Sequence, residues 1–157
     1  MKNLIQNPFR LPDTNGRPIH FWQSGIHYDN LLLHGYRTST VTLPDTSTTA
    51  AAVESYNLPI SCRGQNAIRW GYIMRAVEFH NVMLLASFYD AQGAHLTTMK
   101  HPVSNLKSQF SSVMTTFQIP ENADTVRLSV EFHGNTVACT YFAPWAAFVA
   151  SPSLPVQ

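Results

Sequence analysis

Charged side chains are scarce in this 157-residue chain: Lys, Arg, Asp and Glu make up 12% of it, and the formal net charge is only +1. A soluble domain usually has about 25% charged residues. Binding to nucleic acid needs clustered Lys and Arg that displace counterions, and an anionic membrane surface attracts polybasic runs. We therefore expect neither nucleic acid nor a membrane surface as a partner.

Long apolar runs are absent as well. No segment approaches the roughly 20 apolar residues that span a bilayer, so no membrane insertion is expected. Near the N-terminus, Lys2 is followed only by the short apolar run Leu4-Ile5 before Gln6-Asn7-Pro8, which does not make a signal peptide. Three locations stay open: the cytosol, a spore or other particle, or a secreted protein of which this chain is a fragment.

Metal-binding patterns are also missing. Cys62 and Cys139 lie 77 residues apart, a separation typical of neither a metal site nor a disulfide framework, and we expect two small buried residues without deciding whether they pair. The seven histidines match no zinc-binding helix or ribbon. Glu78-x-His80, on one face of a strand, is a weaker metal alternative. No metal or other cofactor is expected.

Catalytic motifs are lacking too. A glycosidase needs two carboxylates that flank a cleft, but most of the nine acidic residues lie in predicted turns. The chain has no Gly-x-Ser-x-Gly elbow and no glycine-rich phosphate loop. We therefore expect no catalytic residues and no enzyme activity.

Alternating patterns typical of β-strands dominate what is present. Val82–Tyr89 is apolar at nearly every position, which predicts a central strand covered on both faces and followed by a tight turn at 90–93. Thr125–Phe132 alternates strictly between apolar and polar residues, which predicts a strand with one face in the core. The 27 Ser and Thr and 17 Asn and Gln predict an uncharged polar surface.

The whole pattern predicts an all-β fold, a β-sandwich of jelly-roll type with about eight to ten strands and little helix. One domain is expected over residues 1–150, with a loose tail at 151–157. Asn3–Phe9 is predicted to be a first strand at a sheet edge, because Pro8 cannot donate to a ladder. Pro102–Val113 is predicted to be a polar connection with one or two short helical turns.

Three sequence motifs resemble the galactose-binding-like jelly roll of many carbohydrate-binding modules. They are Asn3–Phe9 followed by Pro18 and Phe21-Trp22, the strand Val82–Leu96 with its Phe-Tyr-Asp-x-x-Gly ending, and Phe117–Leu128, which has the form Phe-x-Ile-Pro-x-x-Ala-x-x-Val-Arg-Leu. The resemblance spans nearly the whole chain and implies the fold. It specifies the ligand much less closely, because these motifs are structural.

The chain departs from that family at one site. Many relatives hold a structural calcium with an acidic residue just after Asn-Pro-x-Phe and another in the last strand. The corresponding positions here are Arg10 and the Ala143-Pro144 region. Calcium favours six to eight oxygen ligands that include carboxylates, so we predict no calcium at this position, and a Ca²⁺ titration that raised the melting temperature would contradict the prediction.

Two aromatic groups are candidate sugar-binding sites, because aromatic faces cover the C–H side of sugar rings. Trp70 and Tyr72 share one face of an extended segment beside Arg69, although inward core positions remain an alternative for both rings. The second group is Tyr28, His34 and Tyr36. We expect Trp22 and Trp145 to be core or closure residues.

These observations predict a non-catalytic carbohydrate-binding module that recognises a neutral glycan through stacking aromatics and through amide and hydroxyl groups. The alternative is a structural or assembly module, for instance in a spore coat, a phage particle or another multi-subunit shell. In that case the apolar face formed by Met83, Leu85 and Tyr89 would be buried against a second copy, giving a homo-oligomer.

Overall fold

A computed structural model describes residues 2–11, 22–24, 28–43, 52–77, 80–104, 106–134 and 136–150 of the chain. These residues form eleven strands and no helix, which confirms the all-β prediction. The helical turns expected within 102–113 are not found: the described residues between Pro102 and Ser111 form an irregular connection, and β9 begins at Ser111. The strands are β1 (Trp22–Ser24), β2 (Tyr28–Leu33), β3 (Tyr36–Leu43), β4 (Ala52–Tyr56), β5 (Ile60–Ser61), β6 (Ala67–Arg75), β7 (Val82–Tyr89), β8 (His95–Pro102), β9 (Ser111–Gln118), β10 (Thr125–Phe132) and β11 (Thr136–Val149).

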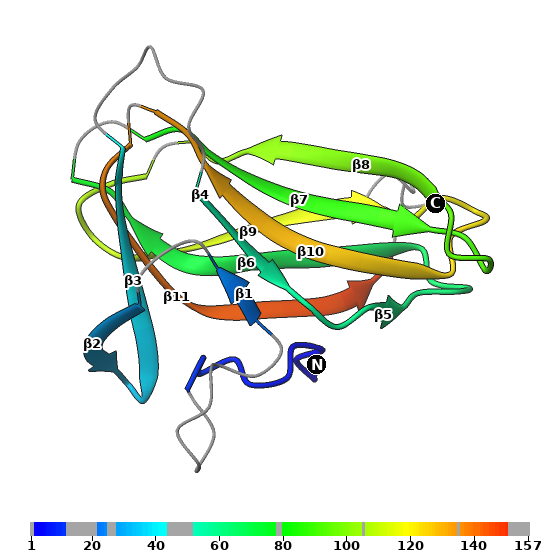
Figure 1. Cartoon of the computed structure of the whole chain (residues 1–157), viewed down its shortest axis with the longest axis horizontal. Coiled ribbons are helices and arrows are strands. Elements are labelled where there is room, and N and C mark those ends of the chain that lie inside the picture. The colour runs from blue at the N-terminus through cyan, green and yellow to red at the C-terminus, as the bar shows by residue number, and fades with distance from the viewer. Residues whose placement is uncertain are drawn as a thin grey trace, which may run out of the picture.

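The strands form two antiparallel sheets packed face to face. The first sheet has the order β1-β4-β10-β7-β8, with the short β5 also paired to β10, and the second has the order β2-β3-β11-β6-β9. Figure 1 shows the two layers running along the long axis of the molecule, with the β2–β3 hairpin at one end and β5 near the other. This arrangement confirms the predicted jelly-roll sandwich.

Strands β7 and β10 lie side by side and supply much of the core, as their alternating patterns predict. Their inward side chains are at most 1% exposed: Val82, Leu84, Ala86, Phe88, Val126, Leu128, Val130 and Phe132. On the outward face of β7 only Leu85 is buried, whereas Met83 and Tyr89 are partly exposed. β7 was expected to be buried on both faces, but its outward face is only partly buried.

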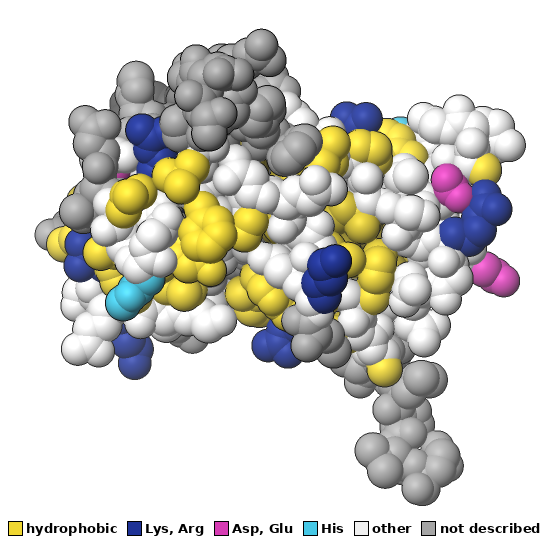
Figure 2. All heavy atoms as spheres, turned by 90° about the horizontal axis from the view of Figure 1, so that it is seen from below, with side chains coloured by type: hydrophobic (Ala, Val, Ile, Leu, Met, Phe, Trp, Pro, Cys, Tyr) yellow, Lys and Arg dark blue, Asp and Glu magenta, His cyan; other side chains and the backbone are white. Residues whose placement is uncertain are grey.

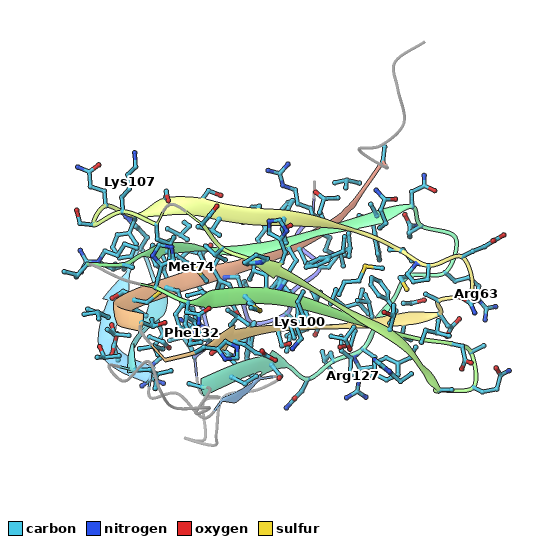
Figure 3. All side chains as sticks on the ribbon, turned by 90° about the horizontal axis from the view of Figure 1, so that it is seen from above. Arg63, Met74, Lys100, Lys107, Arg127 and Phe132 are labelled. Carbon is cyan, nitrogen blue, oxygen red and sulfur yellow. The ribbon has the colours of Figure 1, made fainter. Side chains whose placement is uncertain are left out.

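The second sheet fills the core with aromatic rings. Trp70, Tyr72 and Tyr141 are fully buried. The Tyr72 ring contacts the other two, with centroid distances of 4.9 Å to Trp70 and 5.0 Å to Tyr141. Met74 of β6 and Phe132 of β10 lie between the layers in Figure 3. Burying each such ring contributes about 1.5–3 kcal/mol, so this cluster is a main source of stability.

The N-terminal segment differs from its prediction. Residues 2–11 form no strand, but two backbone hydrogen bonds join them to strands, from Leu4 N to Ala146 O at 2.8 Å and from Arg37 N to Phe9 O at 3.0 Å. Asn7 has a left-handed φ of 52°, which turns the chain where an edge strand was expected. Trp22 lies in the core at 6% exposure, as predicted, and donates from Nε1 to Asn7 O.

Figure 2 shows hydrophobic side chains spread over the side on which the N-terminal segment lies. Four large apolar residues of the described part of the chain are exposed: Val77 at 57%, Leu32 at 50%, Phe9 at 42% and Leu11 at 37%. Both cysteines are buried free thiols, as expected of small core residues, and burial raises the pKa of Cys139 to about 12. In the described part of the chain, no helix has the length and apolar character needed to cross a membrane.

Candidate functional site

A groove runs along the outward face of the second sheet. It consists of two adjoining cavities of about 440 and 430 Å³, which share Ser112, Met114 and Trp145. Its lining comes from β3, β6, β9, β11 and the N-terminal segment: Asn3, Tyr36, Arg69, Ile73, Phe110, Ser111, Ser112, Met114, Ala143, Pro144, Trp145 and Val149. We call this set the sheet groove.

The floor of the sheet groove depends on Gly71. In the ladder, Gly71 lies between Trp145 of β11 and Met114 of β9. A Cβ atom at Gly71 would lie 1.8 Å from Val113 O, so no other residue fits without moving β9. The absence of a side chain at Gly71 therefore lets the backbone of β9 approach β6 closely between Trp145 and Met114.

A β-bulge in β11 turns Trp145 into the sheet groove. Phe142 pairs with Ile73 and Trp145 pairs with Gly71, so three steps along β11 match two steps along β6. The extra residue reverses the alternation of side chains, and Ala143 takes a left-handed φ of 56° within it. Without the bulge, Trp145 would point into the core; with it, the indole is partly exposed.

The side chain of Asn3 holds the bulge in place. Asn3 Nδ2 donates to Pro144 O at 3.1 Å, and Asn3 Oδ1 accepts from Ala146 N at 3.0 Å. Asn3 Oδ1 also accepts from Ile5 N at 3.0 Å, which fixes the N-terminal segment against β11. One amide therefore ties together both sides of the bulge that presents Trp145.

We expect Asn3→Ala to lower the free energy of unfolding by about 1–3 kcal/mol, because three part-buried hydrogen bonds lose their side-chain partner. Urea unfolding followed by tryptophan fluorescence measures this change. Asn57→Ala, at an exposed position, is the matched control and should change stability by less than about 0.5 kcal/mol. An unfolding midpoint for Asn3→Ala equal to that of the control would contradict the role of Asn3.

Aromatic side chains extend the sheet groove toward the β2–β3 hairpin. Tyr36 stacks on Phe9 with ring centroids 4.5 Å apart and meets Phe142 at 6.0 Å. Phe110 packs edge-on against Phe142 at 5.2 Å, and the Arg75 guanidinium lies 4.7 Å above the Phe110 ring. The far end is thus bordered by rings and a cation, whose mutual attraction favours this arrangement.

The predicted binding residues are only partly brought together. Arg69 is exposed and lines the sheet groove, and so does Tyr36. His34 is exposed in the β2–β3 turn and does not line the groove. The side chain of Tyr28 lies outside the described residues.

The prediction that Trp70 and Tyr72 stack on a ligand is wrong in this structure. Both are 0% exposed, because their positions on β6 face the other sheet, and Trp70 Nε1 donates across the sandwich to Ser129 O at 3.2 Å. Trp145, which was expected to be a core or closure residue, lines the groove instead, together with Tyr36 and Phe110. The bulge that reverses its direction has only a weak sequence signal, the Ala143-Pro144 step before it.

A buried ion pair involves Arg10, the residue that the sequence resemblance aligned with a calcium-binding acidic residue. Arg10 Nη1 lies 2.8 Å from Glu54 Oε2 and donates to Ser39 Oγ at 3.1 Å. Arg10 Nη2 donates to the carbonyl oxygens of Arg37 at 2.7 Å and Tyr141 at 3.0 Å. These oxygens already surround a cation, so the residues present do not fit a calcium ion.

Glu54 lies 44 residues from Arg10, which is why no acidic residue near Arg10 in the sequence predicted the pair. The Tyr72 hydroxyl donates to Glu54 Oε1 at 2.9 Å, and burial, followed by the charge of Glu54, raises the pKa of Tyr72 well above its usual value. Elsewhere in the described ranges, no three His, Cys, Asp or Glu side chains gather as a metal site. The suggested Glu78-x-His80 site cannot be placed, since Glu78 lies outside these ranges.

No protein-family model and no curated protein sequence matches the chain. Solved structures match its fold: the enzymatically active domain of tailspike protein 4 of bacteriophage CBA120 has a TM-score of 0.63 at 13% identity, over 91% of this chain and 22% of that chain. The CBM22-1 xylan-binding domain of Paenibacillus barcinonensis Xyn10C has a TM-score of 0.56 at 12% identity, over 91% of this chain and 92% of that domain. The chain has the jelly-roll fold of a carbohydrate-binding module.

A third structure with this module fold, TmCBM61 in complex with β-1,4-galactotriose, has a TM-score of 0.56 at 9% identity and covers 95% of this chain and 100% of that one. The chain thus corresponds to nearly the whole of two binding modules. It spans only 26% of another match, the arabinose-bound α-L-arabinofuranosidase MgGH51. At these identities the likeness establishes the fold.

Proposed function

We propose that this chain is a non-catalytic carbohydrate-binding module and that the sheet groove holds a neutral stretch of glycan. The observation on which this proposal rests is the partly exposed indole of Trp145 at the centre of an open groove on the sheet face. An aromatic face covers the C–H side of a sugar ring, and nearby amides and hydroxyls orient its hydroxyl groups. Asn3, Ser111 and Ser112 supply such groups beside Trp145.

The chemistry of the lining supports binding rather than hydrolysis. The larger cavity is lined only by uncharged side chains, which suits a neutral sugar. Among the described residues, no Asp or Glu lines either cavity of the sheet groove, whereas glycoside hydrolysis requires a pair of carboxylates. The similarity to xylan-binding and galactotriose-bound modules agrees with the proposal.

The assembly alternative has less support. It requires the outward face of β7 to be covered by a second copy, but Leu85 on that face is already 5% exposed within a single chain. Lys100 and Glu131 on the flanking strands approach each other over this face at 3.7 Å. No observation on this face favours a partner over solvent.

Trp145→Ala is expected to weaken glycan binding by about 30-fold or more, which corresponds to about 2 kcal/mol, because the stacking surface is lost. The measurement is isothermal titration calorimetry with neutral oligosaccharides that include xylohexaose and β-1,4-galactotriose. Trp145→Phe should restore much of the affinity. Tyr89→Ala changes a partly exposed aromatic residue on the other sheet and should leave binding unchanged.

If a sugar binds the parent and Trp145→Ala with equal affinity, the sheet groove is the wrong site. If no glycan on a broad array binds the folded parent protein, the proposed function itself is wrong. Circular dichroism of each variant, recorded before titration, separates a lost contact from a lost fold.

A further inference from the structure

We propose that the Arg69 end of the sheet groove binds a carboxylate, so that the preferred ligand is a glycan whose neutral sugars are accompanied by a uronic acid. This inference rests on the proposed function and adds to it the chemical class of the ligand. It follows from the position of Arg69, from the charge of the sheet and from the geometry of guanidinium recognition.

Arg69 projects outward from β6 at one end of the sheet groove, where no described residue provides a counter-ion. Its register neighbours are Thr116 on β9 and Ala147 on β11, neither of which is charged. Trp145 and Val149 line the same cavity of about 430 Å³. Within the described part of the chain, the Arg69 guanidinium forms no ion pair and no side-chain hydrogen bond, and it is exposed.

The outward face of the second sheet carries more positive than negative charge. Arg69 and Arg75 lie on this face, whereas Arg37 follows the groove-lining Tyr36 and lies on the opposite face. The five strands contain one acidic residue, Asp29. The Asp29 carboxylate already accepts hydrogen bonds from the hydroxyls of Thr38 at 2.8 Å and Thr40 at 3.0 Å. A cationic face without free carboxylates attracts acidic ligands and disfavours cationic ones.

A third basic side chain extends this charge at the far end of the groove. Ala76, which follows Arg75, donates from its backbone N to Lys107 O at 2.9 Å, so Lys107 lies close to the Arg75 end. Figure 3 shows Lys107 at one end of the sandwich and Arg63 at the other. Positive charge therefore borders the uncharged centre of the groove at both ends, with Arg69 at one and Arg75 and Lys107 at the other.

The spacing matches a glycan rather than a free anion. Gly71 pairs with Trp145, and Arg69 is two residues further along β6, a distance of about 7 Å along the strand. A sugar stacked on Trp145 thus places a neighbouring sugar, or a substituent, within reach of the Arg69 side chain. The planar guanidinium fork binds a carboxylate through two parallel hydrogen bonds, which gives selectivity that a neutral hydroxymethyl group cannot match.

The test compares acidic oligosaccharides with neutral forms of the same backbone: glucuronoxylan oligosaccharides with their carboxyl-reduced products, and oligogalacturonides with their methyl esters. Titration calorimetry is run on the parent, Arg69→Gln, Arg69→Lys and the control Lys100→Gln, an exposed lysine on the other sheet. We expect the parent to bind the acidic member of one pair about 10-fold more tightly, with a preference that falls as salt is added. Arg69→Gln should reduce this preference below about 2-fold, whereas Lys100→Gln should leave it unchanged.

Three other results are possible, and each overturns the inference. If the parent binds the acidic and the neutral member equally well and Trp145→Ala weakens binding of both, the proposed function holds but Arg69 forms no carboxylate subsite. An acidic preference that Arg69→Gln retains in full moves the anion site away from Arg69. If the folded parent binds neither member of any pair and no neutral oligosaccharide, both the proposed function and this inference are wrong.

Discussion

Arg10→Met is expected to lower the free energy of unfolding by about 3–5 kcal/mol, because it leaves the Glu54 carboxylate buried without its cation. Both side chains are 0% exposed, so water cannot replace the lost partner. The substitution also removes donors from the carbonyl oxygens of Arg37 and Tyr141, which belong to the strands β3 and β11 that Arg10 joins to β4. Urea unfolding monitored by circular dichroism gives the change directly.

Arg63→Met is the matched control for this prediction. Arg63 forms an ion pair with Asp124 at 2.7 Å, but its side chain is 70% exposed, so its loss should cost less than about 1 kcal/mol. The double variant Arg10→Met/Glu54→Leu should lose less than the sum of its two single changes, since it leaves no unpaired charge. Similar costs for Arg10→Met and Arg63→Met would show that the buried network is not stabilising.

The same network bears on calcium. Because the Arg10 guanidinium already contacts the surrounding oxygens, millimolar Ca²⁺ should leave the melting temperature of the parent unchanged. An appreciable rise in that temperature, absent with Mg²⁺, would contradict this expectation.

Trp70→Ala is expected to cost about 3–5 kcal/mol, the range for truncating a large buried ring, and therefore to remove much or all of the stability of the domain. The indole fills the space between the sheets, packs on Tyr72 at 4.9 Å and donates to Ser129 O on β10. Its loss leaves a cavity and removes this hydrogen bond. Thermal unfolding by calorimetry measures the effect.

Two variants separate this structural role from ligand binding. Trp70→Phe keeps most of the ring volume and should cost less, about 1–3 kcal/mol, chiefly from the lost hydrogen bond. It should also bind glycan as the parent does. If Trp70→Ala unfolds at the same temperature as the parent and loses only glycan binding, Trp70 belongs to the binding site and its assignment to the core is wrong.

The strand patterns alone were sufficient for the fold class. The alternation in β7 and β10 predicted two neighbouring core strands, because side chains on a strand point to opposite faces with period two. The turn at 90–93 was predicted from Asp90, whose carboxylate accepts from the backbone N of Gln92 and Ala94 at 2.9 Å. These features are local, so neighbouring residues in the sequence are enough to specify them.

The site was predicted less well, since local pattern does not say which face of a strand looks outward. Trp70 and Tyr72 were correctly assigned to one shared face, but that face is the core. Arg69 and Tyr36 were predicted for the site and line the groove, whereas Asn3 was considered only as part of a strand. The function of Asn3 depends on residues more than 140 positions away.

The sequence by itself determined an all-β sandwich with a sparsely charged, hydroxyl-rich surface, because composition and period-two alternation act through each residue and its near neighbours. Only the tertiary structure decided that Arg10 meets Glu54 and that the bulge before Trp145 turns this ring outward. Both depend on pairing between distant strands. One extra residue in a strand switches every following side chain of that strand to the opposite face of the sheet. No local sequence pattern in this chain indicates that switch.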